Sequence, residues 1–157
     1  YMVYFSMLQP GSYDKIYYAY ANEDFTGLEE APKQLFFSPN EMATIDGDIV
    51  KKDDKFYLFY KTEGEEDKGI KVAESNSLTS GYESNDGNVD QTDQAVEGSG
   101  VFKIIDSDRY ILMYDVYMNN RYEFTESTDL ENFEVIDQEI SMNFHPRHGS
   151  FSTITPH

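Results

Sequence analysis

The 157-residue sequence contains no cysteine, has few basic residues and has no long hydrophobic run. Without cysteine it has no disulfides and no thiolate metal sites, and cysteine usage therefore does not indicate its cellular compartment. The 12 Lys and Arg are outnumbered by 30 Asp and Glu, which gives a net charge of −18. A protein this acidic repels phosphate backbones and anionic membrane surfaces, so neither nucleic acid nor a membrane is an expected partner. No apolar run approaches the roughly 20 residues of a bilayer-spanning helix.

Aromatic residues are abundant, with 13 Tyr and 11 Phe, and they favour strands because their rings pack well on a half-buried sheet. Three similar aromatic runs occupy residues 1–5, 56–60 and 110–114, at offsets of 55 and 54 residues. A second related segment follows the first two runs at residues 16–22 and 70–76, again 54 residues apart. The sequence therefore contains an internal repeat of about 54 residues.

Turn-forming residues separate these runs, and no stretch keeps a helical period, so the pattern predicts strands joined by hairpins. Each copy contains a strand before the aromatic run and another after the second segment. These further strands are predicted near residues 49–50 and 101–102, at 34–37 and 133–136, and at 150–154 as the start of a fourth copy. Four strands per repeat favour a β-propeller over a sandwich, which need not repeat at this period. We expect residues 1–157 to form a single incomplete propeller domain of about three blades plus part of a fourth.

An ionisable residue followed by glycine and a small polar residue stands at the head of each predicted inner strand. The three are Asp46, Glu97 and His148, spaced by 51 residues in both steps. The innermost strand of each blade lines the central channel, so equivalent positions converge on one axial pocket. The glycine after each allows close backbone approach at the crowded axis. The alternative is that these side chains only satisfy the amides of a repeated turn.

Other polar residues are predicted on the same face of the molecule. Lys61 and Glu63 follow one aromatic run and Asp115 follows the next, where a strand returns to the pocket face. Arg147 precedes His148. These residues are candidates for binding sugar hydroxyls, and ordinary solvated turns are the alternative.

Residues 44–60, 96–103 and 147–150 resemble motifs of glycoside hydrolase family 43, and the resemblance covers nearly the whole chain. It implies a five-bladed β-propeller that inverts the anomeric centre. It also implies that Glu97 is the general acid, that Asp46 orients Glu97 and modulates its pKa, and that His148 lies at the channel centre, beside calcium or another ion. Gly47 and Ser99 stand where family members often have proline.

The family's general base is an aspartate of the first blade, and the spacing places it about five residues before Tyr1, outside this chain. The resemblance implies an oligosaccharide or polysaccharide substrate containing arabinose or xylose, no required cofactor, and a secreted or periplasmic location, with calcium at the channel centre as an accompanying ion. Two carboxyl groups flanking a sugar bond suffice for glycoside hydrolysis in principle. A sugar-binding propeller without the base and a pure scaffold propeller are the alternatives.

Overall fold

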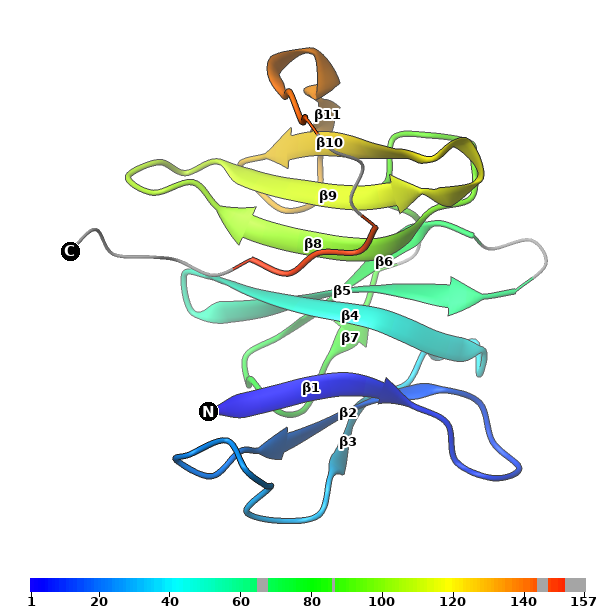
Figure 1. The fold of residues 1–157 in the computed structure, drawn as a ribbon, viewed down its shortest axis with the longest axis vertical. Coiled ribbons are helices and arrows are strands. Elements are labelled where there is room, and N and C mark those ends of the chain that lie inside the picture. Colours follow the sequence, from blue (N-terminus) through cyan, green and yellow to red (C-terminus); the bar gives the residue numbers. More distant parts are fainter. Residues whose placement is uncertain (65–67, 86, 144–146, 152–157) are drawn as a thin grey trace.

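The computed structural model describes residues 1–64, 68–85, 87–143 and 147–151, and these form an all-β fold of three antiparallel sheets (Figure 1). The described residues contain no helix with the length and apolarity required to cross a bilayer. Of two short 3-10 turns, η1 (Tyr117–Asn119) connects two strands of the third sheet and η2 (Asp137–Glu139) follows the last strand of that sheet.

Each sheet is built from strands that are consecutive in the sequence. The first sheet contains β1 (Met2–Met7), β2 (Lys15–Tyr20) and β3 (Lys33–Phe36), in that order. The second contains β4 (Ala43–Lys52), β5 (Lys55–Glu63), β6 (Ile70–Ser75) and β7 (Glu83–Ser84). The third contains β8 (Glu97–Lys103), β9 (Tyr110–Val116), β10 (Arg121–Ser127) and β11 (Glu134–Val135).

The aromatic run of β5 explains why the sheets stack. Successive side chains of a strand point to opposite faces, so Tyr57 and Phe59 contact the third sheet while Leu58 and Tyr60 contact the first. All four are buried. A strand buried on both faces reads as a continuous apolar run, which is what the sequence has at residues 56–60.

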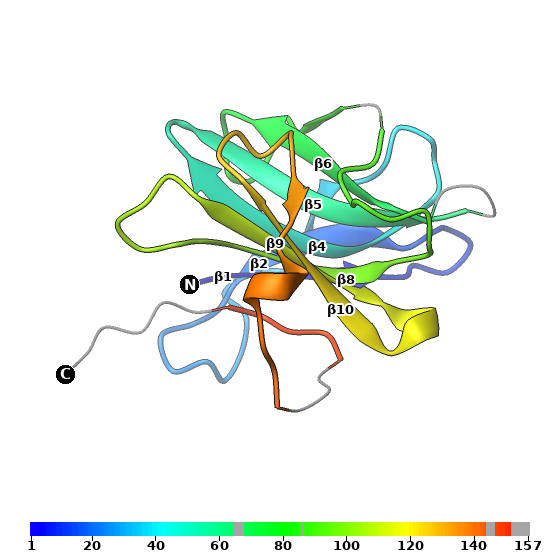
Figure 2. The ribbon, with the colours of Figure 1, turned by 90° about the horizontal axis from the view of Figure 1, so that it is seen from above.

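The three sheets follow one another as blades, with β4 and β8 as the first strands of their sheets and in contact across the boundary (Figures 1 and 2). The predicted all-β, repeating architecture is confirmed, since strands β1, β5 and β9 fall on the three aromatic runs. The first sheet has three strands and the other two have four. Residues 150–151 are not in a strand, and residues 152–154 of the predicted fourth copy lie outside the described residues.

Two bulges at the heads of β4 and β8 correct the predicted equivalence by one residue. Ile45 pairs with Lys61 and Glu97 with Asp115, and each ladder then skips two residues before it resumes. Ile45 is therefore the counterpart of Glu97, and Asp46 is the counterpart of Gly98. The backbone supports this alignment, because φ is +53° at Asp46 and +63° at Gly98. The equal spacing of 51 residues hides this shift, because the structurally equivalent positions Ile45 and Glu97 lie 52 residues apart.

Candidate active site

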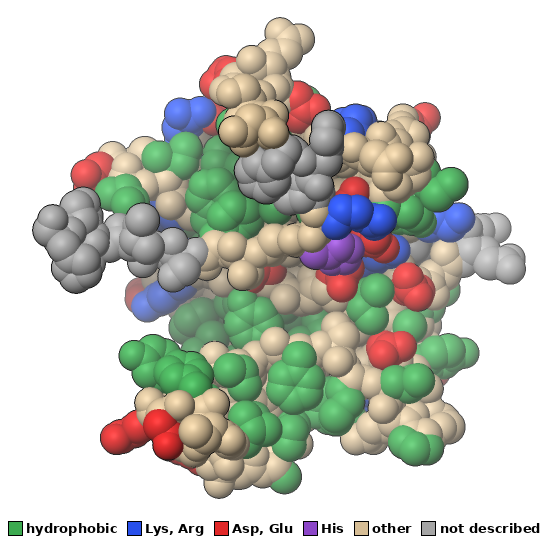
Figure 3. All heavy atoms as spheres, in the orientation of Figure 1, with side chains coloured by type: hydrophobic (Ala, Val, Ile, Leu, Met, Phe, Trp, Pro, Cys, Tyr) green, Lys and Arg blue, Asp and Glu red, His purple; other side chains and the backbone are tan. Residues whose placement is uncertain are grey.

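Glu97 begins β8 and its carboxylate is the centre of a cluster of charged side chains. Oε1 accepts a hydrogen bond from Arg147 Nη2 at 2.9 Å and lies 3.2 Å from His148 Nε2, and Oε2 lies 3.7 Å from Lys61 Nζ. The Glu97 side chain is 21% exposed, so it can still meet a ligand from solvent. Figure 3 shows acidic, basic and histidine side chains gathered in one patch on the face toward the viewer.

Asp115 anchors the Arg147 side chain from a buried position. It lies near the end of β9, directly opposite Glu97 in the ladder, and its side chain is almost fully buried. Its Oδ2 accepts a hydrogen bond from Arg147 Nε at 2.7 Å. This bond, the Asp115 charge and the Glu97 charge all raise the pKa of Arg147 above its ordinary value. One guanidinium therefore bridges two carboxylates, through Nε to Asp115 and through Nη2 to Glu97.

Lys61 approaches Glu97 from the neighbouring blade. It is buried near the end of β5, where Nζ lies 3.4 Å from Glu63 Oε1 and 5.2 Å from the centre of the Tyr117 ring. A cation above an aromatic face is attracted by the ring's negative face. The sequence makes Tyr117, together with Tyr13 and Phe25, a strand-end or loop candidate for stacking on a sugar ring, and the structure places Tyr117 beside Lys61.

Asp46 accepts hydrogen bonds from the two residues that follow Glu97 in β8. Its Oδ2 accepts a hydrogen bond from the amide of Gly98 at 2.9 Å, and its carbonyl accepts one from Ser99 Oγ at 2.8 Å. The amide of Asp46 in turn donates to Ser6 Oγ in β1 at 3.2 Å. Asp46 therefore joins the head of its own strand to the head of the strand that carries Glu97.

The segment that carries Arg147 and His148 lies on two glycines of β8. A Cβ added at Gly98 would lie 2.8 Å from His148 Nδ1, and one at Gly100 would lie 2.6 Å from the Phe151 ring. The Phe151 ring also packs on Phe102, with ring centroids 4.2 Å apart. The glycine predicted to permit close approach after Glu97 therefore has that role.

All seven predicted site residues are described, and the structure brings them together at the heads of β4 and β8 and the ends of β5 and β9. They are Asp46, Lys61, Glu63, Glu97, Asp115, Arg147 and His148. Asp48 also belongs to this region, although the sequence predicts no more for it than a small polar residue of the repeated motif.

Glu97, Asp115 and His148 also present ligand atoms within 4.8 Å of one another. Calcium prefers six to eight oxygen ligands, whereas this set offers two carboxylates and one imidazole. The Arg147 guanidinium already binds both carboxylates and would compete with a metal ion for them. The described residues in this arrangement do not fit a calcium site, and the metal role of His148 stays a prediction.

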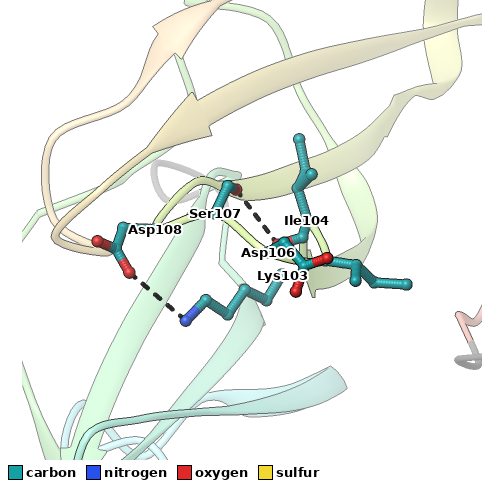
Figure 4. A pocket seen from close by; sticks show the side chains of 6 residues that line it. Lys103, Ile104, Asp106, Ser107 and Asp108 are labelled. Carbon is teal, nitrogen blue, oxygen red and sulfur yellow. Dashed lines mark hydrogen bonds and ion pairs between the residues drawn. The ribbon is translucent and has the colours of Figure 1, made fainter.

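A separate hollow of about 540 Å³ lies at the turn between β8 and β9, at the far end of β8 from Glu97 (Figure 4). Residues 103–108 line it, and Lys103 Nζ lies 3.7 Å from Asp108 Oδ1 within it. Because a single hairpin turn forms this hollow, it reflects the shape of that turn.

Comparison with known proteins agrees with the fold and with the motifs. A family model for a glycosyl hydrolase domain related to glycoside hydrolase family 43, described as "Probable glycosyl hydrolase domain", matches residues 1–157. Among curated proteins, none matches the chain.

Several solved structures share the fold. A thermostable family-43 glycoside hydrolase is 16% identical, with a TM-score of 0.62 over 95% of this chain and 56% of that one. An endo-1,4-β-xylanase from Bacteroides thetaiotaomicron is 16% identical, with a TM-score of 0.56 over 86% of this chain and 53% of that one. The catalytic domain of a family-62 α-L-arabinofuranosidase from Coprinopsis cinerea is 14% identical, with a TM-score of 0.58 over 84% of this chain and 45% of that one.

The chain thus spans about half the length of these three proteins, and at such identities the likeness is one of fold. The family match covers residues 1–157. Each of its three sheets is one blade, and the chain belongs to the glycosyl hydrolase domains related to glycoside hydrolase family 43, with their β-propeller fold.

Proposed function

We propose that this chain supplies the general acid of an inverting glycoside hydrolase, and that Glu97 is that acid. The observation that carries the proposal is the placement of Glu97 at the head of an inner strand, partly exposed, with Asp46 bound to the amide of the next residue. Glu97 donates its proton to the glycosidic oxygen as the sugar bond breaks. Asp46 fixes the strand from which Glu97 projects.

The three side chains that contact Glu97 have distinct roles in this proposal; they are those of Arg147, Lys61 and His148. Arg147 keeps its Nε bond to buried Asp115 while its Nη2 leaves Glu97, so the arginine stays anchored when substrate enters. Lys61 and His148 then bind sugar hydroxyls in place of the carboxylate. With these contacts exchanged for substrate, Glu97 faces the glycosidic oxygen to which it donates its proton in the proposed reaction.

Inversion also needs a base that activates water on the opposite face of the sugar ring. The acid and base carboxyl groups of inverting enzymes lie about 6.5–9.5 Å apart, which leaves room for that water. We assign the base to an aspartate upstream of Tyr1, as the repeat spacing predicts. For the substrate we propose an arabinose- or xylose-containing plant polysaccharide or oligosaccharide, met outside the cytoplasm.

One observation favours a second candidate, a sugar-binding propeller without catalysis. The Glu97 carboxylate contacts the side chains of Arg147, His148 and Lys61, and a carboxylate held in this way can accept hydrogen bonds from sugar hydroxyls. An aspartate at the expected upstream position supports the enzyme, and another residue type there supports the binding protein.

The proposal is tested by comparing leaving groups in the full-length protein. Glu97→Ala is assayed on aryl arabinofuranosides and aryl xylosides whose phenols are good or poor leaving groups. General acid catalysis contributes roughly 10²- to 10⁴-fold, so kcat should fall by that factor on poor leaving groups and far less on good ones, which need no protonation.

The matched control is Glu74→Gln in β6 of the neighbouring blade, where Glu74 pairs with Lys55 at 3.0 Å. It should leave both rates unchanged. Equal rates for Glu97→Ala and wild type on poor leaving groups would remove Glu97 from the acid role. Sugar binding by calorimetry without turnover would favour the second candidate.

A further inference from the structure

One carboxylate outside the proposed catalytic set, that of Asp48, joins all three blades. Its Oδ1 accepts hydrogen bonds from the Tyr4 hydroxyl in β1 at 2.6 Å and from the amide of Ile49 at 3.1 Å. Its Oδ2 accepts a hydrogen bond from the amide of Val101 in β8 at 2.8 Å. Asp48 itself lies in β4. A single side chain therefore holds one strand from each sheet.

The bond to Val101 matters because β4 and β8 belong to different sheets, so no backbone ladder fixes one against the other. The boundary between these two strands is the blade seam. Two carboxylates cross it, from Asp46 to the amide of Gly98 at 2.9 Å and from Asp48 to that of Val101. Both amides lie in the strand that starts with Glu97.

The blade seam sets where Glu97 lies relative to the neighbouring blade. Lys61, across the seam, is 3.7 Å from Glu97 Oε2 and is fixed in β5, which pairs with β4. A slide of β8 along β4 would change that separation and would also carry Glu97 away from the substrate face. Asp46 and Asp48 are spaced to prevent this slide, since they bind β8 at two points three residues apart.

The buried position of the Asp48 carboxylate is one that folding stability alone does not favour. Burial raises the pKa of Asp48 above its ordinary value, although hydrogen bonds from Tyr4, Val101 and Ile49 act to lower it. Burial and the Asp48 charge likewise raise the pKa of Tyr4. Burying a carboxylate carries a desolvation cost that a neutral side chain would avoid.

We propose that Asp48 is a positioning residue for the general acid, which it holds in register by binding the amide of Val101 across the blade seam. This rests on the proposed function, in which Glu97 protonates the leaving oxygen. Asp48 does not touch substrate. It acts through the backbone of β8, and its loss therefore affects the proton transfer step more than substrate binding.

The test is Asp48→Asn in the full-length protein, assayed on the same good and poor leaving groups. Asparagine offers one acceptor oxygen and turns an NH₂ group toward one of the donors that the carboxylate bound. A shift of about 1 Å in a catalytic group costs on the order of 100-fold in rate. We expect kcat on poor leaving groups to fall at least tenfold more than kcat on good ones, with KM nearly unchanged.

The matched control is Asp137→Asn. Asp137 Oδ1 also accepts a backbone amide, that of Phe124, at 2.7 Å, but in the outer part of the third blade. This variant should lose stability in thermal unfolding without changing the leaving-group ratio. If Asp48→Asn does not fold, Tyr4→Phe removes one of the three bonds to Asp48 and should move the ratio in the same direction by a smaller factor.

The outcomes separate the two proposals. A wild-type leaving-group ratio in folded Asp48→Asn or, failing that, in Tyr4→Phe overturns the positioning role, provided that Glu97→Ala shows the leaving-group effect. If Glu97→Ala shows no such effect, the proposed acid fails and this inference fails with it. A ratio that changes equally in Asp137→Asn would also overturn it, because any lost carboxylate–amide bond would then suffice.

Discussion

Replacing Gly98 by alanine tests how tightly the site is packed on its own backbone. Gly98 has φ of +63°, a region that costs an L-residue roughly 1–2 kcal/mol. The new Cβ would lie 2.8 Å from His148 Nδ1, against 3.4 Å for the start of ordinary contact, so the ring must move by about 0.6 Å. His148 Nε2 is already 3.2 Å from Glu97 Oε1, so a displacement of this size that carries the ring away from β8 lengthens that contact beyond hydrogen-bond range.

Gly11→Ala is the matched control, because Gly11 has φ of +74° and nothing lies within 4 Å of its added Cβ. It should lose only the backbone contribution, about 1 kcal/mol of unfolding free energy in urea titrations. Gly98→Ala should lose about 1 kcal/mol more, and its kcat/KM on sugar substrates should fall about tenfold, the factor that 1.4 kcal/mol represents. Equal stability and equal kcat/KM in the two variants would show that His148 does not depend on the missing Cβ.

Two further predictions concern charge. Arg147→Lys keeps the positive charge but loses the fork that bridges Asp115 and Glu97, so kcat/KM should fall by roughly tenfold in steady-state kinetics, and an unchanged value would contradict the bridge. Because burial raises the pKa of Asp48, folding favours its protonated form, and its contribution to stability is complete below the ordinary Asp pKa of about 4 and is lost as pH rises through the folded-state pKa. The unfolding free energy of wild type minus that of Asp48→Asn, from urea titrations, should therefore decrease as pH rises from about 4, the ordinary Asp pKa, through the folded-state pKa, and an increase would mean the opposite shift.

The strands could be predicted from the sequence because their cause is local. A period of two and a run such as residues 56–60 state which side chains are buried, and a repeat near 54 residues states that the same unit recurs. The gathering of Glu97, Asp115 and Arg147 also followed from this reasoning, because strand heads and strand ends meet on one face of a bladed fold. These parts of the site depend only on where strands begin and end.

The register of the bulges and the pairings across blades could not be predicted in this way. A bulge is decided by backbone angles such as the positive φ of Asp46, and counting residues cannot locate it within one position. The bond from Arg147 to Asp115 joins residues 32 apart, and the bond from Asp48 to Val101 joins residues 53 apart. Neither pair shares a strand ladder, so periodicity carries no information about them.

The alternative that ionisable residues at the blade heads only satisfy turn amides is true of one residue and untrue of another. The Asp46 carboxylate accepts the amide of Gly98, as that alternative requires. Glu97 differs, since its polar contacts among the described residues are with the side chains of Arg147, His148 and Lys61. Inner strands of neighbouring blades have no ladder between them, so their free amides need acceptors near the axis, and carboxylates there serve the fold first. Among the described residues the Glu97 carboxylate has side-chain partners and accepts no amide, and this difference separates it from the carboxylates of Asp46 and Asp48.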